Sequence, residues 1–379
     1  MKNYFASCLF FLVFFRISFW YSSLSASIII GVVGVLYILK KKNIISRYLR
    51  KKDIYLGLLL AFMLFYATVL DISGDSGAGI SNLFSVRLVA IVVMSIAPAA
   101  LVQGLFVKGR VATLRLIVFY VFSVQLIIWV LTYISSDAKF FAYAFLGASD
   151  SVNLRSYNLH VRGFGLSNEM NFTTPFMMTI VALLFLKRTV FGILVFFSQL
   201  VNSNLTVVAG ILGFLHTNIS YIKKVSILIC VSVVVVYYSE YFLSRLIAEF
   251  QGTQSQTVNA LLTDHLVFMP NDIFSKIFGG GYYVFQTIGN ARSDIGWVIL
   301  YNYGGIVFMC LVLLFIGLIS FEAFASKTLF LLWFAAGVVL NIKGLIISPN
   351  SYLFMTFIFI FLRRNRAIQK SVKRRAVSG

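Results

Sequence analysis

Long apolar runs recur from one end of the sequence to the other, and they restrict the folds that this chain can adopt. A helix that crosses a bilayer needs roughly 17–25 mostly apolar residues, and it must satisfy its own backbone because the bilayer core holds no water. Charged residues make up 12% of the 379 positions, whereas a soluble domain has about a quarter. We therefore predict an all-α, polytopic integral membrane protein with a single membrane domain over 1–379. About twelve transmembrane helices are expected, near 4–22, 24–39, 54–70, 86–106, 116–135, 171–186, 189–202, 205–219, 225–243, 294–319, 328–345 and 347–362.

Lysines and arginines divide unequally between the two sides of these spans. If both termini are cytoplasmic, 23 of the 32 basic residues lie in inner segments, eight lie in outer segments, and Arg16 falls within the first span. Short loops keep their basic residues on the cytoplasmic side of a membrane. The distribution therefore predicts cytoplasmic termini, two long outer loops at about 136–170 and 244–293, a basic inner segment at 40–53 and an inner tail at 363–379.

The region 189–219 allows two interpretations. Four polar residues near its centre either mark the turn of a hairpin or lie within one long helix: Gln199, Asn202, Ser203 and Asn204. One long helix would move Lys223 and Lys224 to the outer side and invert part of the topology. A hairpin keeps the charge distribution intact, so we predict two spans with a break between them.

The net charge of +20 raises the question of nucleic-acid binding. Much of the surplus gathers in 40–53 and 363–379, next to spans, where basic side chains face the anionic headgroups of the inner leaflet. We predict that membrane lipids, and no nucleic acid, are the partners of these segments. The three cysteines lie far apart within apolar runs, so they indicate neither a metal site nor a disulfide framework: Cys8, Cys230 and Cys310.

Acidic residues gather on the opposite, outer side. Ten of the twelve lie there under this topology, and the two long outer loops carry most of them. Long connections without secondary structure are uncommon and usually functional. Transporters place ionisable residues within their spans, and this sequence has almost none at mid-membrane depth. The pattern favours chemistry at the outer membrane boundary.

The first long loop contains the stretch DSVNLRSYNLHVRGFGLSNEM, which carries Arg155, His160, Arg162 and Glu169. The planar fork of donors on arginine suits phosphate oxygens, and the glycines beside Arg162 let a backbone approach closely. An anion-binding loop is one interpretation, and an ordinary solvated loop is the other.

The second long loop contains TVNALLTDHLVFM, then GGGYY, then NARSD. Five residues of the first stretch share one helical face and predict a helix on the membrane surface: Val258, Leu261, Leu262, His265 and Leu266. In NARSD, Ser293 and Asp294 are expected to cap the following helix. That role does not explain Arg292, which either pairs with Asp294 or faces phosphate.

Four motifs follow one another between about 155 and 360: RGFGLSNEMN, SRL, FGGGYY with SDIGWVILYNYGGI, and NIKGLIISPNSYLFMTFIFI. Their order resembles that of the Wzy-type O-antigen and capsule polysaccharide polymerases and, more distantly, of the O-antigen ligases. The sequence departs from the paired Arg-x10-Gly motifs of some polymerases, because Thr173 and Gln256 stand eleven residues after Arg162 and Arg245. Ligases tend to carry a histidine where this chain has Asp294, which favours a polymerase.

The resemblance implies a GT-C-like polymerase/ligase fold and a glycosyltransferase of the bacterial inner membrane. Such enzymes join oligosaccharide repeat units, carried on undecaprenyl pyrophosphate, into long O-antigen, capsule or exopolysaccharide chains. Both donor and acceptor are lipid-linked, and neither a metal nor a cofactor is expected. A flippase and a chain-length regulator of the same pathway are expected partners.

The predicted site residues follow from this chemistry. A base must take the proton of the attacking sugar hydroxyl, and Asp294 is the first candidate, followed by His265 and Glu169. Fixed cations stabilise the charge that develops on the pyrophosphate. The predicted substrate contacts are Arg162, Arg245, Arg292, Arg155, Lys343 and His160, although Lys343 is equally well explained as a snorkelling lysine.

Three other functions compete with this prediction. A lipid-linked oligosaccharide flippase would line a central cavity with charged residues inside its spans, and this sequence does not. A twelve-span solute transporter would often have two similar halves and a large central inner loop, and neither is visible. An O-antigen ligase is the nearest alternative enzyme.

Overall fold

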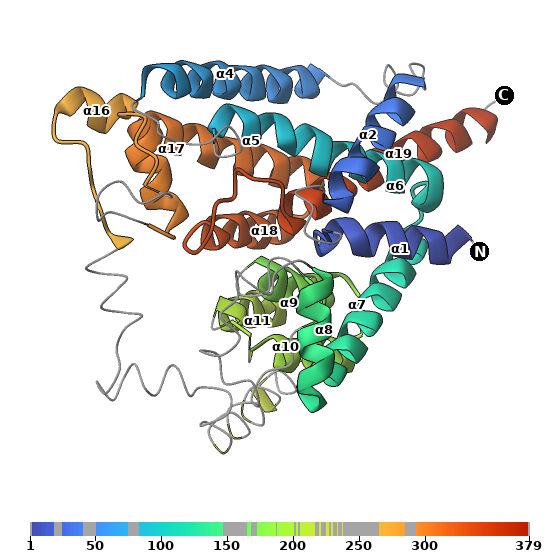
Figure 1. Ribbon diagram of the computed structural model, residues 1–379. Helices are drawn as coiled ribbons and strands as arrows, with labels where there is room; N and C mark the ends of the chain where they lie inside the picture. The colour runs from blue at the N-terminus through green and yellow to red at the C-terminus, as the bar shows by residue number, and fades with distance from the viewer. Residues whose placement is uncertain are drawn as a thin grey trace. The chain divides into compact units, whose positions relative to one another are not determined.

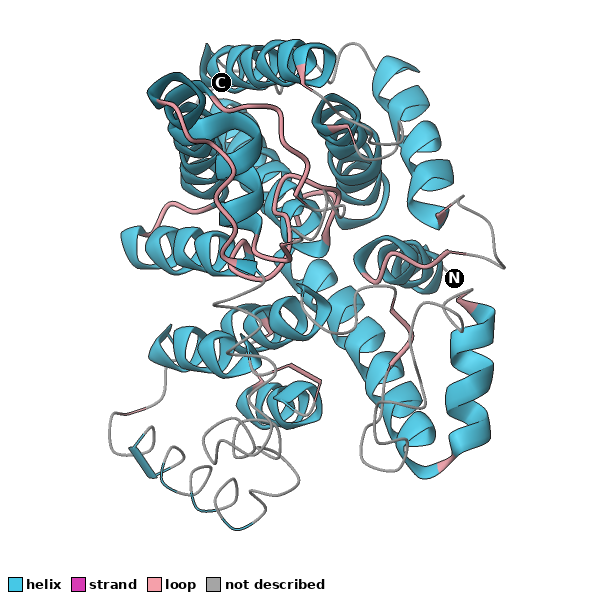
Figure 2. Cartoon of the chain, turned by 60° about the vertical axis from the view of Figure 1, so that its left-hand side comes forward, coloured by secondary structure: helices cyan, strands magenta, loops and turns pink. Residues whose placement is uncertain are grey.

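The computed structural model describes residues 2–18, 25–40, 51–74, 83–146, 165–167, 173–186, 188–200, 202–203, 205–216, 265–284 and 293–377, with a few isolated positions between 220 and 237. Helices are the only regular elements in this part of the chain, as predicted, and it contains no strand (Figure 2). Two isolated backbone bridges, Ser18 with Ser25 and Ile295 with Gly344, are its only extended pairings.

The chain divides into two compact units, which we describe separately. The first unit comprises Met1–Phe14, Ala26–Ile117 and Thr263–Gly379, and the second comprises Phe15–Ser25 and Val118–Leu262. The elements of the first unit are α1 (Lys2–Phe14), α2 (Ala26–Lys40), α4 (Lys51–Ser73), α5 (Phe84–Ile91), η2 (Val92–Ile96), α6 (Ala97–Val102), η3 (Gln103–Val107), the start of α7 (Val111–Ile134), α16 (Ile273–Phe278), α17 (Gly296–Ala323), α18 (Lys327–Leu340) and α19 (Ser351–Val377). The second unit contains the rest of α7, α8 (Ser136–Phe145), α9 (Thr173–Phe185), α10 (Thr189–Leu200) and α11 (Leu205–His216).

Four helices are long and apolar enough to cross a membrane: Ile54–Ser73 of α4, the continuous run Phe84–Val107, Val111–Ile134 and Gly296–Ala323. Six shorter apolar helices of the described segments accompany them. The chain is therefore a membrane protein built from helices. The count of twelve spans and the GT-C-like fold stay predictions.

Most helices lie where the hydropathy pattern predicted them. The region 189–219 is broken between Leu200 and Leu205, so α10 and α11 are separate helices that both pack against α9. The hairpin interpretation is therefore confirmed at the level of secondary structure. The break contains Asn202 and Ser203, both buried, and the backbone amide of each donates to the carbonyl of Gln199.

One predicted boundary was wrong. The first span was expected over 4–22, but α1 ends at Phe14, and Arg16 beyond it has a left-handed backbone with φ of 51°. A left-handed residue cannot continue a right-handed helix. The first long loop was expected at about 136–170, and its first residues, 136–145, form the helix α8. Ser135 caps this helix by accepting a hydrogen bond from the Ala138 amide at 3.2 Å.

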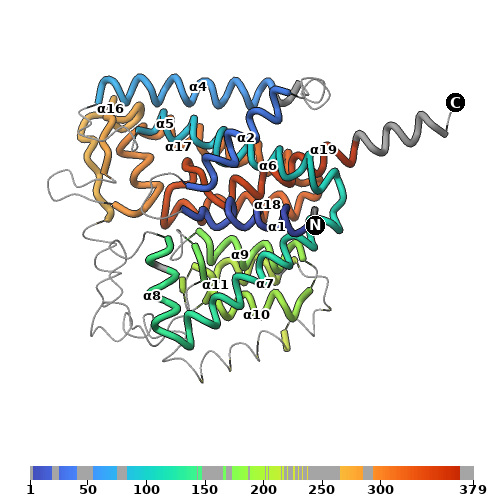
Figure 3. Tube along the Cα trace, turned by 45° about the vertical axis from the view of Figure 1, so that its right-hand side comes forward, coloured from blue at the N-terminus to red at the C-terminus, as the bar shows by residue number. Residues whose placement is uncertain are grey.

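In the first unit, α19 lies at the centre of the helix packing. Every residue from Ser351 to Ile360 is buried, and α19 contacts α1, α6, α17 and the π-helical turns of the 84–107 span. Figures 1 and 3 show α4 beside α5 and α17 on one side of this unit. Asn350 caps the start of α19, because its side-chain oxygen accepts a hydrogen bond from the Leu353 amide at 2.9 Å.

A sharp kink interrupts α17. Gly305 has φ of 64° and ψ of −166°, a conformation that is essentially confined to glycine. A β-carbon at this position would lie 2.4 Å from the carbonyl oxygen of Ile277. The kink thus lets the chain just after α16 approach the backbone of α17.

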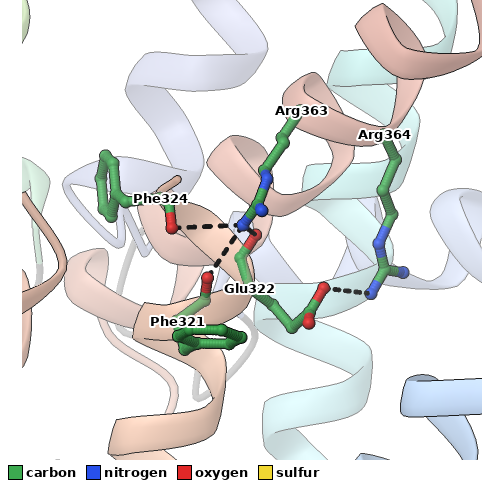
Figure 4. A network of polar contacts seen from close by, with 5 residues as sticks. All are labelled: Phe321, Glu322, Phe324, Arg363 and Arg364. Carbon is green, nitrogen blue, oxygen red and sulfur yellow. Dashed lines mark hydrogen bonds and ion pairs between the residues drawn. The ribbon is translucent and has the colours of Figure 1, made fainter. Parts of the chain in front are cut away.

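The opposite end of α17 is held by arginine (Figure 4). Arg363 Nη1 donates to the carbonyls of Phe321, Glu322 and Phe324 at 2.9, 3.0 and 3.2 Å. Arg364 lies 3.9 Å from the Glu322 carboxylate. The predicted tail at 363–379 therefore begins within a helix, because α19 continues through Val377. The first two arginines of the tail, Arg363 and Arg364, contact the end of α17.

Candidate functional site

Three of the predicted site residues belong to the described part of the first unit: His265, Asp294 and Lys343. The other six lie outside the described residues: Glu169, Arg155, His160, Arg162, Arg245 and Arg292. The described part of the site therefore consists of His265, Asp294 and Lys343 with their surroundings.

His265 and Asp294 lie together, although 28 residues separate them in the chain. The backbone N–H of Asp294 donates to Nδ1 of His265 at 3.3 Å. Next to it, the Ser293 hydroxyl donates to the carbonyl of His265 at 2.7 Å. Ser293 is fully buried, while His265 and Asp294 are half-buried. The serine thus fixes the two candidate acid–base residues in one place and leaves both partly accessible.

Lys343 belongs to a turn that pairs with the same segment. The backbone N–H of Gly344 donates to the carbonyl of Asp294 at 3.1 Å, and Ile295 forms a parallel bridge with Gly344. Asn341 supports this turn, because its side-chain oxygen accepts from the Ile346 amide at 2.9 Å. The backbone next to Lys343 is therefore bound directly to Asp294. The segments NIKG and SDIG, far apart in the sequence, meet here.

The predicted helix cap at Ser293 and Asp294 was wrong. The helix α17 begins only at Gly296, and no side chain caps it. The Ser293 oxygen instead accepts from the Ile295 amide at 3.2 Å, and the Trp297 amide donates to the carbonyl of Asn341 at 3.1 Å. The turn after α18 thus satisfies an amide that a side chain was expected to bind. Among the described residues, no hydrogen bond holds the Asp294 carboxylate.

The contact with Asp294 shows which ring nitrogen of His265 accepts a hydrogen bond. A backbone N–H can only donate, so Nδ1 of His265 must accept and cannot carry a proton. The neutral ring then carries its proton on Nε2 and offers a donor there. In this arrangement His265 suits hydrogen bonding to a substrate oxygen, and Asp294 is the better base of the two.

The segment after His265 differs from the predicted surface helix. Residues 258–264 lie outside the description, and from Leu266 to Asn271 the chain is not helical. Asn302, fully buried in α17, holds it: its Nδ2 donates to the carbonyl of Val267 and its Oδ1 accepts from the Met269 amide, both at 2.7 Å. Leu266 is therefore not part of an apolar helical face.

A second polar cluster was missed by sequence reasoning. Asp71, near the end of α4, accepts hydrogen bonds from the hydroxyls of Tyr283 and Tyr303, the latter at 2.7 Å. Ser85 adds its amide at 3.0 Å and its hydroxyl at 2.5 Å. Tyr283 also accepts from the Phe84 amide at 2.8 Å. Asp71 therefore ties α4 to α5, to α17 and to the glycine-rich turn.

The tyrosines of this cluster act as donors. Burial, strengthened by the hydrogen bond to Asp71, raises the pKa of Tyr283 far above its usual range, so its hydroxyl keeps its proton at neutral pH. Two features of the sequence could have drawn attention to this cluster: Asp71 lies near the end of an apolar span, and Tyr282 and Tyr283 follow three glycines. Residues that lie 212 positions apart could not be paired from sequence alone.

No group of three or more histidine, cysteine, aspartate or glutamate residues in the described segments could hold a metal ion. The polar groups at the site are the His265 imidazole, the partly exposed Asp294 carboxylate, Lys343 and backbone amides. Such a set is suited to proton transfer and to binding oxygen-rich, anionic substrates.

Comparison with known proteins gave no match: no protein-family model, no curated protein and no solved structure is similar to this chain.

Proposed function

We propose that this protein is a glycosyltransferase that polymerises polyprenyl-pyrophosphate-linked oligosaccharide repeat units at the outer face of a bacterial cytoplasmic membrane. The observation that carries the proposal is the meeting of Asp294, His265 and the turn of Lys343 at the start of α17. Residues from two separate motifs of the polymerase resemblance supply that site.

The reaction is a displacement at the anomeric carbon of the growing chain. A hydroxyl of the incoming repeat unit forms a new C–O bond there, and the C–O bond to the pyrophosphate breaks. Asp294 takes the hydroxyl proton, since its carboxylate is partly accessible and its backbone is fixed on both sides. The bonding electrons leave with the polyprenyl pyrophosphate.

Cations stabilise the charge that develops on that leaving group. Arg162 and Arg245 are proposed for this role, with Arg155, Arg292 and Lys343 as further contacts. The Nε2–H of His265 donates to a sugar or phosphate oxygen, and His160 and Glu169 are the reserve candidates for acid–base work. No metal is required by this scheme.

The unequal distribution of basic residues supports the orientation that the proposal needs. That distribution favours cytoplasmic termini, and under this topology the His265–Asp294 site lies on the outer side. The lipid-linked oligosaccharide is then both donor and acceptor, and a flippase must deliver it to that face. A chain-length regulator is a further proposed partner.

An O-antigen ligase is the second candidate. The observation in its favour is that an imidazole, that of His265, lies directly on the backbone of Asp294, where ligases tend to carry a histidine. A ligase would transfer a finished chain to a different acceptor.

Deletion of the gene tests the proposal when the surface polysaccharide is separated on a gel. We expect single repeat units in place of the long ladder, and the wild-type gene should restore the ladder. Loss of all capped polysaccharide would indicate a ligase, and loss of export would indicate a flippase. A normal ladder in the deletion strain would refute the proposed function.

A further inference from the structure

The short helix α16 and the chain before it present large apolar side chains to the surroundings. Ile273 and Phe274 are 76% and 69% exposed, and Phe268 is 58% exposed. Ile277 and Phe278, one turn later, are also exposed. Asp272 and Lys276 occupy the other face of the helix. This division into an apolar and a charged face is typical of a helix at a membrane surface.

The glycine-rich turn after α16 enters the kink of α17. The Gly281 amide donates to the carbonyl of Tyr303 at 2.9 Å, and the Gly280 amide approaches that of Asn302 at 3.4 Å. Both carbonyls lie just before the kink at Gly305. The turn thus pairs with the backbone of α17 at its kink.

Side chains complete this pairing. The Tyr66 hydroxyl of α4 lies 2.6 Å from the carbonyl oxygen of Phe278 and 3.2 Å from that of Gly304. Asn302 binds the backbone of Val267 and Met269 on the other arm of the segment. Irregular backbone is tolerated in a bilayer only where the protein satisfies its polar groups. The arms on both sides of α16 meet this requirement at these positions.

The place of the segment follows from its contacts with α4. The Tyr66 hydroxyl reaches the carbonyl of Phe278, and Gly281 lies against Gly74, the residue after α4. The C-terminal end of α16 therefore lies beside the Ser73 end of this membrane span. Figures 1 and 3 show α16 against the ends of α4 and α17.

We propose that the acyl chains of bilayer lipids at the Ser73 end of α4 cover the apolar face of α16. The exposed face of α4 supports this occupant, because Phe62, Phe65 and Val69 are also exposed on a helix that crosses the membrane. The apolar face of α16 continues that lipid-facing surface. As a result, the chain that carries His265 is held at the bilayer boundary.

Spin labels provide the test. Cys8, Cys230 and Cys310 are replaced, and single cysteines are introduced by Phe274→Cys, Lys276→Cys and Phe62→Cys. The labelled full-length proteins are placed in vesicles of phosphatidylcholine and phosphatidylglycerol only. Collisions with molecular oxygen, which concentrates in the bilayer, are compared with collisions with a water-soluble nickel chelate.

The ratio of oxygen to nickel accessibility is expected to be several-fold higher at position 274 than at 276, and close to that at 62 on α4. Greater nickel access at 274 than at 276 would place α16 in water and overturn the proposal. Low access to both reagents at 274 would show that protein covers the helix, which overturns it equally.

The unmodified protein offers a second measurement that needs no substitution. A lipophilic diazirine, activated by light within the same vesicles, should label the peptide that contains 273–278, and absence of label there would contradict the proposal. These vesicles contain no polyprenyl lipid, and neither readout requires enzymatic activity. The result is therefore independent of the proposed polymerase function.

Discussion

The two ends of the first unit are held together in different ways. At the Ser73 end of α4, three hydroxyls and one backbone amide converge on the Asp71 carboxylate, while Asp294 and His265 remain partly accessible. At the other end, the guanidinium of Arg363 binds three carbonyls at the end of α17, and Arg364 lies beside Glu322 (Figure 4).

This difference separates the end that carries the proposed catalytic residues from the end at which arginine anchors one helix to another. Arginine satisfies the carbonyls at the C-terminal end of a helix and suits its negative dipole end, so Arg363 has a complete structural role. At the Ser73 end of α4, neutral hydroxyl and amide groups donate to Asp71. The Asp294 carboxylate at the same end accepts no hydrogen bond from the described residues. Five variants, arranged from the largest expected effect to the smallest, test this division.

If Asp294 is the base of the proposed polymerase, Asp294→Asn should reduce polymer formation by about 10²–10⁴-fold, the usual contribution of a general base. The backbone groups of Asp294 make its hydrogen bonds, so the protein should still fold and insert. The gel profile of surface polysaccharide is the measurement, and Asp272→Asn in the same loop is the control that should leave it unchanged. Polymer of normal length from Asp294→Asn would move the base to His265, Glu169 or His160.

Gly305→Ala should destabilise the protein strongly, because a β-carbon would lie 2.4 Å from the Ile277 carbonyl oxygen. The strained backbone alone costs about 1–3 kcal/mol. Gly317 in the same helix has only Phe334 within 4 Å of an added β-carbon, at 3.8 Å. Gly317→Ala should therefore be neutral or stabilising by roughly 0.5–1 kcal/mol. The thermal unfolding midpoints in detergent compare the two, and equal midpoints would argue against the kink.

Tyr303→Phe should cost about 1–3 kcal/mol, because it removes one donor from the buried side of the Asp71 cluster. The matched control is Tyr301→Phe, two residues earlier, whose hydroxyl has no hydrogen bond among the described residues. The same thermal midpoints serve as the measurement. A loss of stability from Tyr301→Phe as large as that from Tyr303→Phe would mean that Asp71 does not organise this end.

Arg363→Gln should have a smaller effect, about 0.5–1.5 kcal/mol, because glutamine can still donate to one carbonyl. Arg366→Gln, one turn later on α19, is the control. Arg366 is exposed and lies near enough to Arg115 for like-charge repulsion, so its replacement should not lower stability. If both variants are equally destabilised, the specific role of Arg363 is excluded.

Asp272→Asn should have the smallest effect, and that effect should depend on pH. The pKa of Asp272 lies below its usual value because the Ser275 side chain and amide bind its carboxylate. Since the folded pKa is lower than the unfolded one, near 3.9, the charged carboxylate stabilises the fold above about pH 4. The difference in midpoint between wild type and Asp272→Asn should shrink as the pH falls through the folded pKa. A difference that grows on acidification would reverse the sign of this linkage.

Hydropathy and charge alone determined much of the architecture. Apolar runs must become helices in a bilayer, so the positions of α2, α9, α10 and α18 could be predicted within a few residues. The break between α10 and α11 was also visible, because polar residues interrupt the run.

The site was only partly visible in the sequence. Asp294, His265 and Lys343 could be selected as residue types that suit proton transfer and anion binding. Their meeting could not be predicted, because it depends on backbone hydrogen bonds between Asp294, His265 and Gly344. The incorrect cap at Ser293 has the same cause, since the carbonyl of Asn341 replaced the expected side-chain acceptor.

What the sequence by itself determined is therefore the helical membrane class, the approximate span positions and the set of candidate side chains. Those properties depend on local hydrophobicity and charge, which act over one helix length. Only the tertiary structure decided that the turn after α16 enters the kink at Gly305 and that Asp71 joins Tyr283 and Tyr303. These contacts satisfy backbone and side-chain polar groups far apart in the chain, and their geometry exists only once the helices have packed.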